Sequence, residues 1–254
     1  MKLKILGCSG GIGPNLRTTA MLLDDDVLID AGTGVGELTL DEMVRIDHVF
    51  ITHSHLDHIC SLPFLIDTVG YRRNRPLTVY GTGETVDALR THVFNNAIWP
   101  DFTRLPRPDA PYLQFHEISL GETVTLAGRN ITALCADHLV PAIGYWLDSG
   151  DASLVFSGDT GPNDALWKIV NGIGNLRYLI IETAFCNRDY AIAMASRHLC
   201  PSLLAAELSQ LRLPAEIFIT HLKPGDMALT MTEVAATLHA FQPKMLEHGQ
   251  VIEF

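Results

Sequence analysis

Short apolar runs separated by polar or glycine-rich turns dominate the chain, and this pattern predicts many strands with fewer helices. The first half has predicted strands at residues 2–7, 48–51 and 77–81, a hairpin at 21–29, and helices at 61–69 and 84–95. The second half has predicted strands at 112–118, 123–126, 130–136, 143–147, 154–157, 178–181, 216–219 and 251–253, and helices at 165–170, 202–211 and 232–241.

Each half runs from strands to helices, so two such halves are expected to pack sheet on sheet with helices outside, an α+β arrangement. No linker and no short-period repeat interrupts the pattern, which predicts a single domain over residues 1–254 made of two similar strand–helix halves. Residues 96–111 contain four prolines and form a long predicted loop, typical of a lid or a contact surface.

Composition narrows the possible partners and the compartment. The 254 residues are 47% hydrophobic, enough for a large core, and the formal net charge is -11. An acidic surface repels polyphosphate chains, so extended nucleic acid is an unfavourable partner. The five cysteines form no CxxC pair, and no signal peptide or membrane-length apolar run is present. A cytoplasmic protein with reduced thiols and no membrane association is expected.

The strongest chemical signal is a cluster of metal-ligating residue types at positions 53–58, which read His-Ser-His-Leu-Asp-His. Imidazole and carboxylate groups bind zinc, manganese and iron. The spacing puts His53 and His55 on the same side of an extended segment, while Asp57 and His58 can reach a second point nearby. A solvated polar turn is the alternative, but three histidines and an aspartate directly after a buried strand favour a metal site.

Four local ligands cannot fill two metal ions, so distant ligands are expected. Three polar residues follow other predicted strands, namely His138, Asp159 and His221. Each alone could be a capping or turn residue, but their shared position at strand ends favours convergence on one rim of a sheet sandwich. The sequence therefore predicts a two-metal centre.

These motifs, in this order along most of the chain, resemble those of the metallo-β-lactamase superfamily. The resemblance implies a four-layer αββα sandwich and a dinuclear site holding two divalent ions, with zinc expected and manganese or iron as alternatives. It places His53, His55 and His138 on one ion. It places Asp57, His58 and His221 on the other, with Asp159 bridging both.

Two further motifs resemble the phosphodiesterase branches of that superfamily. Glu182, in Ile-Glu-Thr-Ala-Phe at 181–185, and His198, in Ser-Arg-His-Leu-Cys-Pro at 196–201, are similar to a glutamate–histidine pair that donates a proton. The glycine-rich opening at 6–11 and residues 28–34 look closest to the class II cyclic nucleotide phosphodiesterases. Ser61 and Cys200 depart from the usual glycine and threonine, which bears on substrate preference.

The resulting hypothesis is hydrolysis of a 3′,5′-cyclic nucleotide to the 5′-monophosphate by a hydroxide that the two metals share. Asp57, Glu182 and His198 are the expected catalytic residues. His198 would protonate the leaving oxygen, and Glu182 would orient the ring and keep it charged. The expected partner is a small phosphodiester substrate.

Other activities on the same scaffold are a ribonuclease Z-like cleavage of tRNA 3′ ends and the hydrolysis of thioesters or lactones. The charge of -11 and the lack of a basic arm oppose the first. The glutamate–histidine pair opposes the second, because those leaving groups need less help. A non-enzymatic scaffold is opposed by the complete ligand set.

Trp99, Phe102 and Tyr112 are expected to pack in the core or in a possible homodimer, with base stacking as the alternative.

Overall fold

The apolar runs of residues 2–81 form a seven-stranded mixed sheet in a computed structural model that describes residues 1–254. The sheet also contains the strand at 113–117, which was predicted as part of the second half, and the last strand of the chain. The strand order is β16-β1-β2-β3-β4-β5-β8. These strands are β1 (Lys2–Gly7), β2 (Ala20–Leu23), β3 (Val27–Ile29), β4 (His48–Phe50), β5 (Leu77–Gly81), β8 (Leu113–Glu117) and β16 (Val251–Glu253).

The second half forms another seven-stranded mixed sheet, ordered β15-β14-β13-β12-β11-β10-β9. Its strands are β9 (Thr123–Leu126), β10 (Arg129–Cys135), β11 (Ile143–Asp148), β12 (Ser153–Phe156), β13 (Leu176–Glu182), β14 (Glu216–Thr220) and β15 (Lys244–Met245). Strands β9 to β12 pair antiparallel, whereas β12 to β15 pair parallel. The parallel part brings the carboxyl ends of β12, β13 and β14 to one edge.

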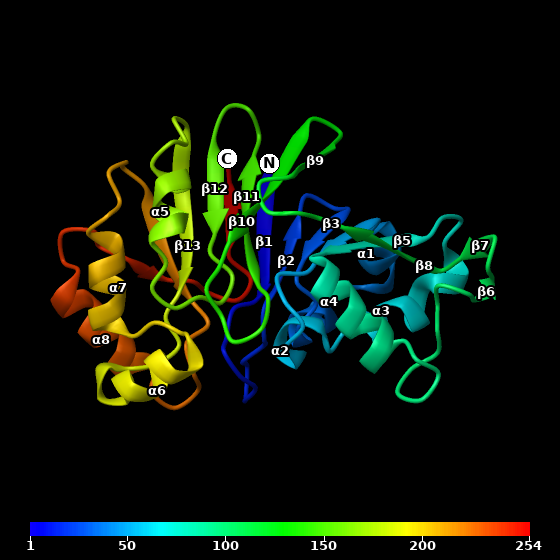
Figure 1. The fold of residues 1–254 in the computed structure, drawn as a ribbon, viewed down its shortest axis with the longest axis horizontal. Coiled ribbons are helices and arrows are strands. Elements are labelled where there is room, and N and C mark those ends of the chain that lie inside the picture. Colours follow the sequence, from blue (N-terminus) through cyan, green and yellow to red (C-terminus); the bar gives the residue numbers. More distant parts are fainter.

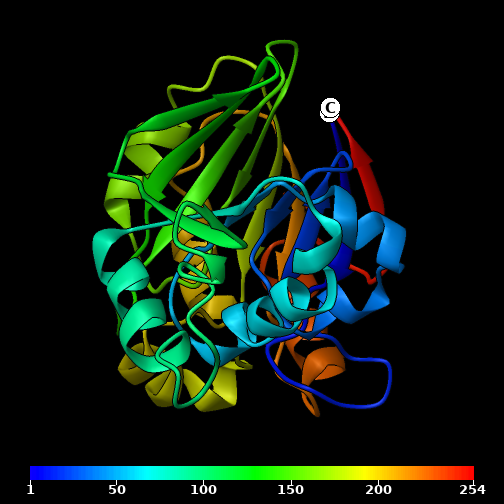
Figure 2. The ribbon, with the colours of Figure 1, turned by 90° about the vertical axis from the view of Figure 1, so that its right-hand side faces the viewer.

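Helices cover the outer faces of both sheets (Figures 1 and 2). Beside the first sheet lie α1 (Leu40–Arg45), α2 (Leu56–Ile59), α3 (Leu62–Val69) and α4 (Gly83–Ala88), with the short turns η1 (Thr33–Glu37), η2 (Gly70–Arg72) and η3 (Leu89–Val93). Beside the second lie α5 (Asp164–Val170), α6 (Tyr190–Ser196), α7 (Pro201–Leu208) and α8 (Met227–Thr237), with η4 (Asn187–Asp189).

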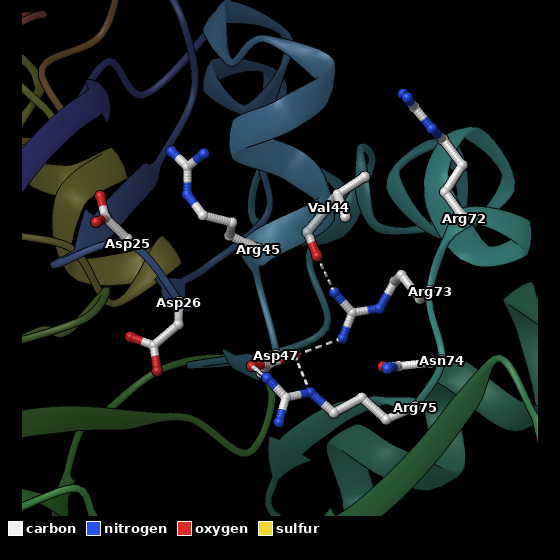
Figure 3. A pocket seen from close by; sticks show the side chains of 9 residues that line it. All are labelled: Asp25, Asp26, Val44, Arg45, Asp47, Arg72, Arg73, Asn74 and Arg75. Atoms are coloured by element: carbon white, nitrogen blue, oxygen red, sulfur yellow. Dashed lines mark hydrogen bonds and ion pairs between the residues drawn. The ribbon is translucent and has the colours of Figure 1, made fainter.

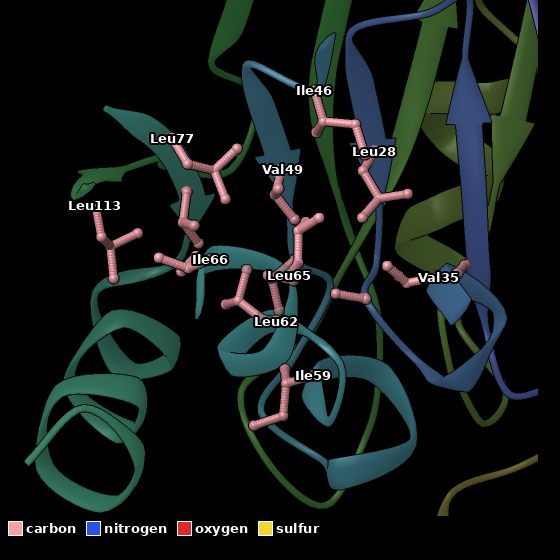
Figure 4. Packing of buried hydrophobic residues seen from close by; sticks show 14 of the residues in the cluster. Leu28, Val35, Ile46, Val49, Ile59, Leu62, Leu65, Ile66, Leu77 and Leu113 are labelled. Carbon is pink, nitrogen blue, oxygen red and sulfur yellow. The ribbon is translucent and has the colours of Figure 1, made fainter. Parts of the chain in front are cut away.

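Three clusters of buried apolar side chains fill the three interfaces between these four layers. One of 21 residues joins the first sheet to its helices, and part of it is drawn in Figure 4. One of 20 residues lies between the two sheets, and another of 20 joins the second sheet to its helices. Because each sheet is covered on both faces, inner strands such as β2 and β3 are continuous apolar runs, whereas the edge strands β9 and β16 alternate with more exposed residues. The predicted α+β, αββα sandwich is therefore confirmed.

Several element boundaries differ from the sequence-based predictions. The predicted helix 84–95 is regular only to Ala88 and continues as a π-helical turn over Leu89–Val93. The last helix lies at Met227–Thr237 rather than 232–241. The loop at 96–111 contains a two-residue hairpin between β6 (Pro106–Arg107) and β7 (Ala110–Pro111). Helices α1 and α6 were not predicted, because they bury few side chains and have weak apolar periodicity.

The arrangement places several loops at one edge of the sandwich. The chain reaches this edge where β4, β10, β12, β13 and β14 end, which are the places where the sequence carries the candidate ligands and the glutamate. No helix in the structure combines the length and the apolarity that crossing a bilayer requires.

Candidate metal centre

The histidine loop begins three residues after the end of β4 and turns into helix α2. His53 is fully buried in the segment that follows the strand, and His55 is the last residue before the helix begins. Asp57 and His58 belong to the first turn of α2. The change from extended to helical backbone therefore aims the two pairs of side chains in different directions.

The first group of candidate ligands joins this loop to the end of β10. The Nδ1 atom of His55 lies 3.1 Å from Nε2 of His53 and 3.1 Å from Nε2 of His138. The three side chains offer ligand atoms that all lie within 4.8 Å of one another. The structure thus brings together the three residues that were predicted to share one ion.

The second group joins helix α2 to the end of β14. Asp57, His58 and His221 offer ligand atoms within 4.8 Å of one another, and Nε2 of His221 lies 3.7 Å from Oδ2 of Asp57. The rings of His58 and His221 stack, with centroids 5.5 Å apart. These are the three residues predicted to share the other ion.

Asp159 lies between the two groups, as expected for a bridging ligand. Its Oδ2 is 3.7 Å from Nε2 of His53, which belongs to the first group, and 3.3 Å from Nε2 of His58, which belongs to the second. Its Oδ1 is 3.3 Å from Nδ1 of His221. Asp159 is only 2% exposed, so few waters compete for its oxygens.

The chemistry of these side chains fits divalent cations. Nε2 of His58 and both ring nitrogens of His221 are buried and make no hydrogen bond. Burial of a polar atom without a hydrogen bond costs free energy, so these three nitrogens, two of which lie 3.3 Å from oxygens of Asp159, fit ligation of a cation. Imidazole and carboxylate are the donor set that zinc and similar ions take. The residues present therefore fit two divalent ions.

The electrostatics of the cluster favour neutral imidazoles at most of these positions. Burial, together with the neighbouring His58, lowers the pKa of His53 well below its ordinary value. Burial also lowers the pKa of His221 to about 3, against the charge of Asp159. In contrast, Asp159 and Asp30 raise the pKa of His58 well above its ordinary value despite burial. Ligation requires a neutral ring, so binding of a cation would displace the His58 proton.

A buried aspartate that sequence analysis did not assign holds His58 in place. Asp30 is 0% exposed, and its Oδ2 accepts a hydrogen bond of 2.7 Å from Nδ1 of His58. Its Oδ1 accepts from the backbone N–H of Thr52 at 2.8 Å. Such contacts fix the tautomer and leave Nε2 free for a ligand. In the sequence, the feature that points to Asp30 is that this charged residue directly follows the apolar strand β3.

Glu182 and His198 form a buried pair beside the ligand cluster. Nδ1 of His198 donates to Oε1 of Glu182 at 2.6 Å, and a ring nitrogen of His198 belongs to a group with His138 and Asp159. Burial alone would lower the pKa of His198, but the charge and hydrogen bond of Glu182 raise it above its ordinary value. Every predicted site residue therefore lies in one region of the structure.

A family model described as "Beta-lactamase superfamily domain" matches residues 25–242. A "Probable 3′,5′-cyclic-nucleotide phosphodiesterase" from Yersinia pestis is 26% identical over 208 residues, which are 71% of this chain and 58% of that protein. "Ribonuclease BN" from Citrobacter koseri is 29% identical over 163 residues, which are 59% of this chain and 50% of that protein. The chain thus spans only between half and two thirds of the length of these relatives.

Solved structures agree over the whole chain. Unliganded yeast PDE1 has a TM-score of 0.83 at 19% identity, covering 100% of this chain and 99% of its own. The metallo-β-lactamase fold protein YhfI from Bacillus subtilis has a TM-score of 0.78 at 19% identity, covering 99% of both chains. At this identity the likeness shows the fold alone, because one fold hosts many activities. With the family match over most of its length, the chain belongs to the metallo-β-lactamase superfamily.

Proposed function

We propose that this chain is a metal-dependent phosphodiesterase that hydrolyses a 3′,5′-cyclic nucleotide to the 5′-monophosphate. The observation that carries the proposal is the 2.6 Å hydrogen bond between His198 and Glu182, placed beside the candidate ligands His138 and Asp159. Cleavage of a 3′,5′-cyclic phosphodiester releases a ribose oxygen as an alkoxide, which needs a proton, whereas a thioester releases a thiolate, which departs with less help.

The protein groups around His198 determine where its proton is delivered. Glu182 occupies Nδ1 of His198, so Nε2 is the ring atom left to face the candidate centre. Glu182 itself is fixed by backbone N–H groups of Thr160, Ala184 and Leu199, at 3.1, 3.0 and 3.2 Å. This rigid carboxylate orients the imidazole, and Nε2–H donates to the leaving ribose oxygen.

Metal ions would occupy the two groups of ligands described above, His53, His55 and His138 on one side and Asp57, His58 and His221 on the other, with Asp159 shared. When bound, two divalent ions supply an ionised water at neutral pH and stabilise charge on phosphoryl oxygens. Zinc is the proposed ion, on the basis of the histidine-rich donor set, and manganese and iron remain alternatives.

The cleft next to the site supports a small substrate with one phosphate. A cleft of about 710 Å³ opens beside His138 and Arg197, within the range of small-molecule sites. Glu84 and Asp137 line it, and the only arginine in its wall is already paired with Asp137. Carboxylates in the wall repel anionic groups, and this repulsion grows with the number of phosphates, so a polynucleotide is disfavoured more than a cyclic mononucleotide.

A ribonuclease activity is the competing proposal, because the Citrobacter koseri relative is named Ribonuclease BN. Such an enzyme binds a polyanion, and this chain has 29 acidic against 18 basic residues. A net charge of -11 disfavours tRNA binding. The cyclic nucleotide is therefore the substrate that we propose.

The proposal is tested by ranking turnover of the zinc-loaded protein on cyclic AMP, cyclic GMP, bis(p-nitrophenyl) phosphate, a lactone and a precursor tRNA. We expect a cyclic nucleotide to give the highest kcat/KM, with the 5′-monophosphate as the product on chromatography. Faster cleavage of the precursor tRNA or of the lactone would overturn the substrate assignment.

The role of His198 is tested by H198A. Turnover of a cyclic nucleotide is expected to fall by a factor on the order of 10²–10⁴, because the leaving alkoxide loses its proton donor. The metal content should stay at the wild-type value in elemental analysis. A substrate whose leaving group is nitrophenolate should be affected much less, since it departs without protonation. An equal loss on both substrates would contradict the acid role, and loss of metal would identify His198 as a ligand.

A further inference from the structure

Arg197, the residue before His198, has a backbone conformation that arginine rarely adopts. It ends helix α6 in the left-handed region, with φ of 53° and ψ of 55°. Glycine is the usual residue at this point of a helix, because a Cβ atom makes the conformation unfavourable. An arginine in this conformation therefore has a free-energy cost, and we expect its side chain to make contacts that offset this cost.

The Arg197 side chain reaches the segment that carries the candidate ligand His138. Its Nη1 donates to Oδ1 of Asp137 at 3.0 Å and to the backbone carbonyl of His138 at 3.0 Å. The guanidinium group therefore ties the end of α6 to the loop after β10. The side chains of Arg197 and Asp137 are each about half exposed, so their ion pair depends on geometry more than on burial.

The Arg197 backbone contacts the imidazole of the same histidine. Nδ1 of His138 donates to the carbonyl oxygen of Arg197 at 3.1 Å. This bond places the ring proton on Nδ1 and leaves Nε2, which faces His55 at 3.1 Å, free to bind an ion. The left-handed backbone at Arg197 is what aims this carbonyl toward the ring.

The loop that carries Asp159 packs against the same residue. A Cβ at Gly161 would lie 3.3 Å from the Cα of Arg197, so the two backbones are in close contact. The N–H of Gly161 donates to the carbonyl of Asp137 at 2.8 Å, and the N–H of Asp137 donates to Oγ1 of Thr160 at 2.9 Å. Three loops, each bearing one site residue, thus meet at Arg197.

We propose that Arg197 is a positioning residue that fixes His138 for metal binding and ties it to the segment bearing the proton donor His198. Its carbonyl sets the tautomer of His138, and its guanidinium holds the His138 main chain. The inference rests on the proposed metal centre, but it does not depend on which substrate the protein hydrolyses.

The test is R197G, measured by competition for zinc with a chromophoric chelator. Glycine removes the guanidinium and relieves the left-handed backbone, so the metal-free variant should melt at the wild-type temperature or higher. One of the two zinc dissociation constants should nevertheless rise about 10-fold, the low end of the range for outer partners of metal ligands. A residue that only ends the helix would leave both constants unchanged.

Q242G is the matched control. Gln242 is also an exposed residue with a positive φ, of 46°, but it is not one of the site residues or their partners. It should leave both zinc constants at their wild-type values. If R197G fails to fold, R197K keeps the charge with a different donor geometry and should still raise one constant. Unchanged constants in the folded Arg197 variant, or an equal rise in both, would overturn the inference. A wild-type chain that binds no zinc would instead overturn the proposed centre itself.

Discussion

Three of the candidate ligand histidines, His53, His58 and His138, are held through the ring nitrogen that does not face the centre. His58 donates its Nδ1 proton to Asp30, and Nδ1 of His53 lies 3.0 Å from the hydroxyl of Thr52. That hydroxyl also contacts Asp30, at 2.9 Å from Oδ2. One buried carboxylate thus organises two imidazoles, and its negative charge strengthens the basicity of His58.

The importance of this carboxylate is tested by D30N. The amide group would present a donor either to the N–H of Thr52 or to Nδ1 of His58, so one of the two hydrogen bonds is lost. We expect zinc affinity to fall between 10- and 100-fold, measured by chelator competition. D25N, the same substitution at an exposed position in the turn between β2 and β3, is the control and should bind zinc like the wild type. Wild-type affinity in D30N would show that Asp30 does not orient His58.

At the scale of elements, the positions of the ligands followed from the apolar strands that precede them. The candidate ligands 53, 138, 159 and 221 come one to three residues after β4, β10, β12 and β14, and parallel strand ends must meet at one edge. The apolar pattern of a strand is a local property of the sequence, so the strands and the positions where they end can be predicted from it. Short helices such as α1 were missed, although Thr39 and Glu42 form a capping box that marks its start.

Contacts between distant polar side chains could not be read from the sequence. Asp30 follows a buried strand, but nothing in the sequence indicates that its partner is His58, 28 positions later. Arg197 looks like an ordinary surface cation, and only the structure shows its left-handed backbone and its contact with His138. Such pairings depend on how two sheets and several loops pack together, which local pattern does not encode.

A second polar cluster supports the opposite, amino-terminal end of β4. Asp47 precedes this strand and accepts hydrogen bonds from Arg73 at 2.7 Å and from Arg75 (Figure 3). Arg73 is nearly buried, with 4% of its side chain exposed, whereas 68% of Arg75 is exposed. Arg73 also donates to the carbonyl of Val44, at the end of α1. The cluster thus links η2, α1 and β4.

Removing the carboxylate from this cluster should destabilise the fold. D47A leaves the buried Arg73 charge with only a carbonyl partner, which is expected to cost about 3 kcal/mol of unfolding free energy. R75A removes an exposed partner of the same carboxylate and should cost at most about 1 kcal/mol. Urea denaturation of the two variants measures both values. Equal losses of unfolding free energy in D47A and R75A would show that the burial of Arg73 does not determine how much the cluster stabilises the fold.

At the scale of the whole molecule, an ion pair joins the two sheets at the edge away from the candidate metal centre. Arg129, at the start of β10, donates from Nη2 to Asp26 at 2.8 Å and from Nη1 to Asp24 at 3.2 Å. Both aspartates lie in the turn between β2 and β3. The hydrogen bonds and charge of Arg129 hold the pKa of Asp26 below its ordinary value.

The ion pair between Arg129 and Asp26 should make the free energy of unfolding fall as the pH is lowered into the acid range. Asp26 binds its proton less tightly in the folded state, so its contribution is complete above the unfolded pKa of about 3.9 and is lost as pH falls through the lower folded pKa. D26N should therefore lower the unfolding free energy by about 1 kcal/mol at pH 7. The difference from wild type should shrink below about pH 4. A difference that stays constant down to pH 2 would contradict this assignment.

The proposed activity requires two divalent ions held between the two halves of the molecule. The most direct test is the zinc content of the folded chain after loading and dialysis, measured by elemental analysis on wild type and D159A. We expect two ions per wild-type chain and at most one in D159A, because Asp159 is the only candidate ligand that faces both groups. A wild-type chain that retains no zinc, or a D159A chain that retains two ions, would contradict the account.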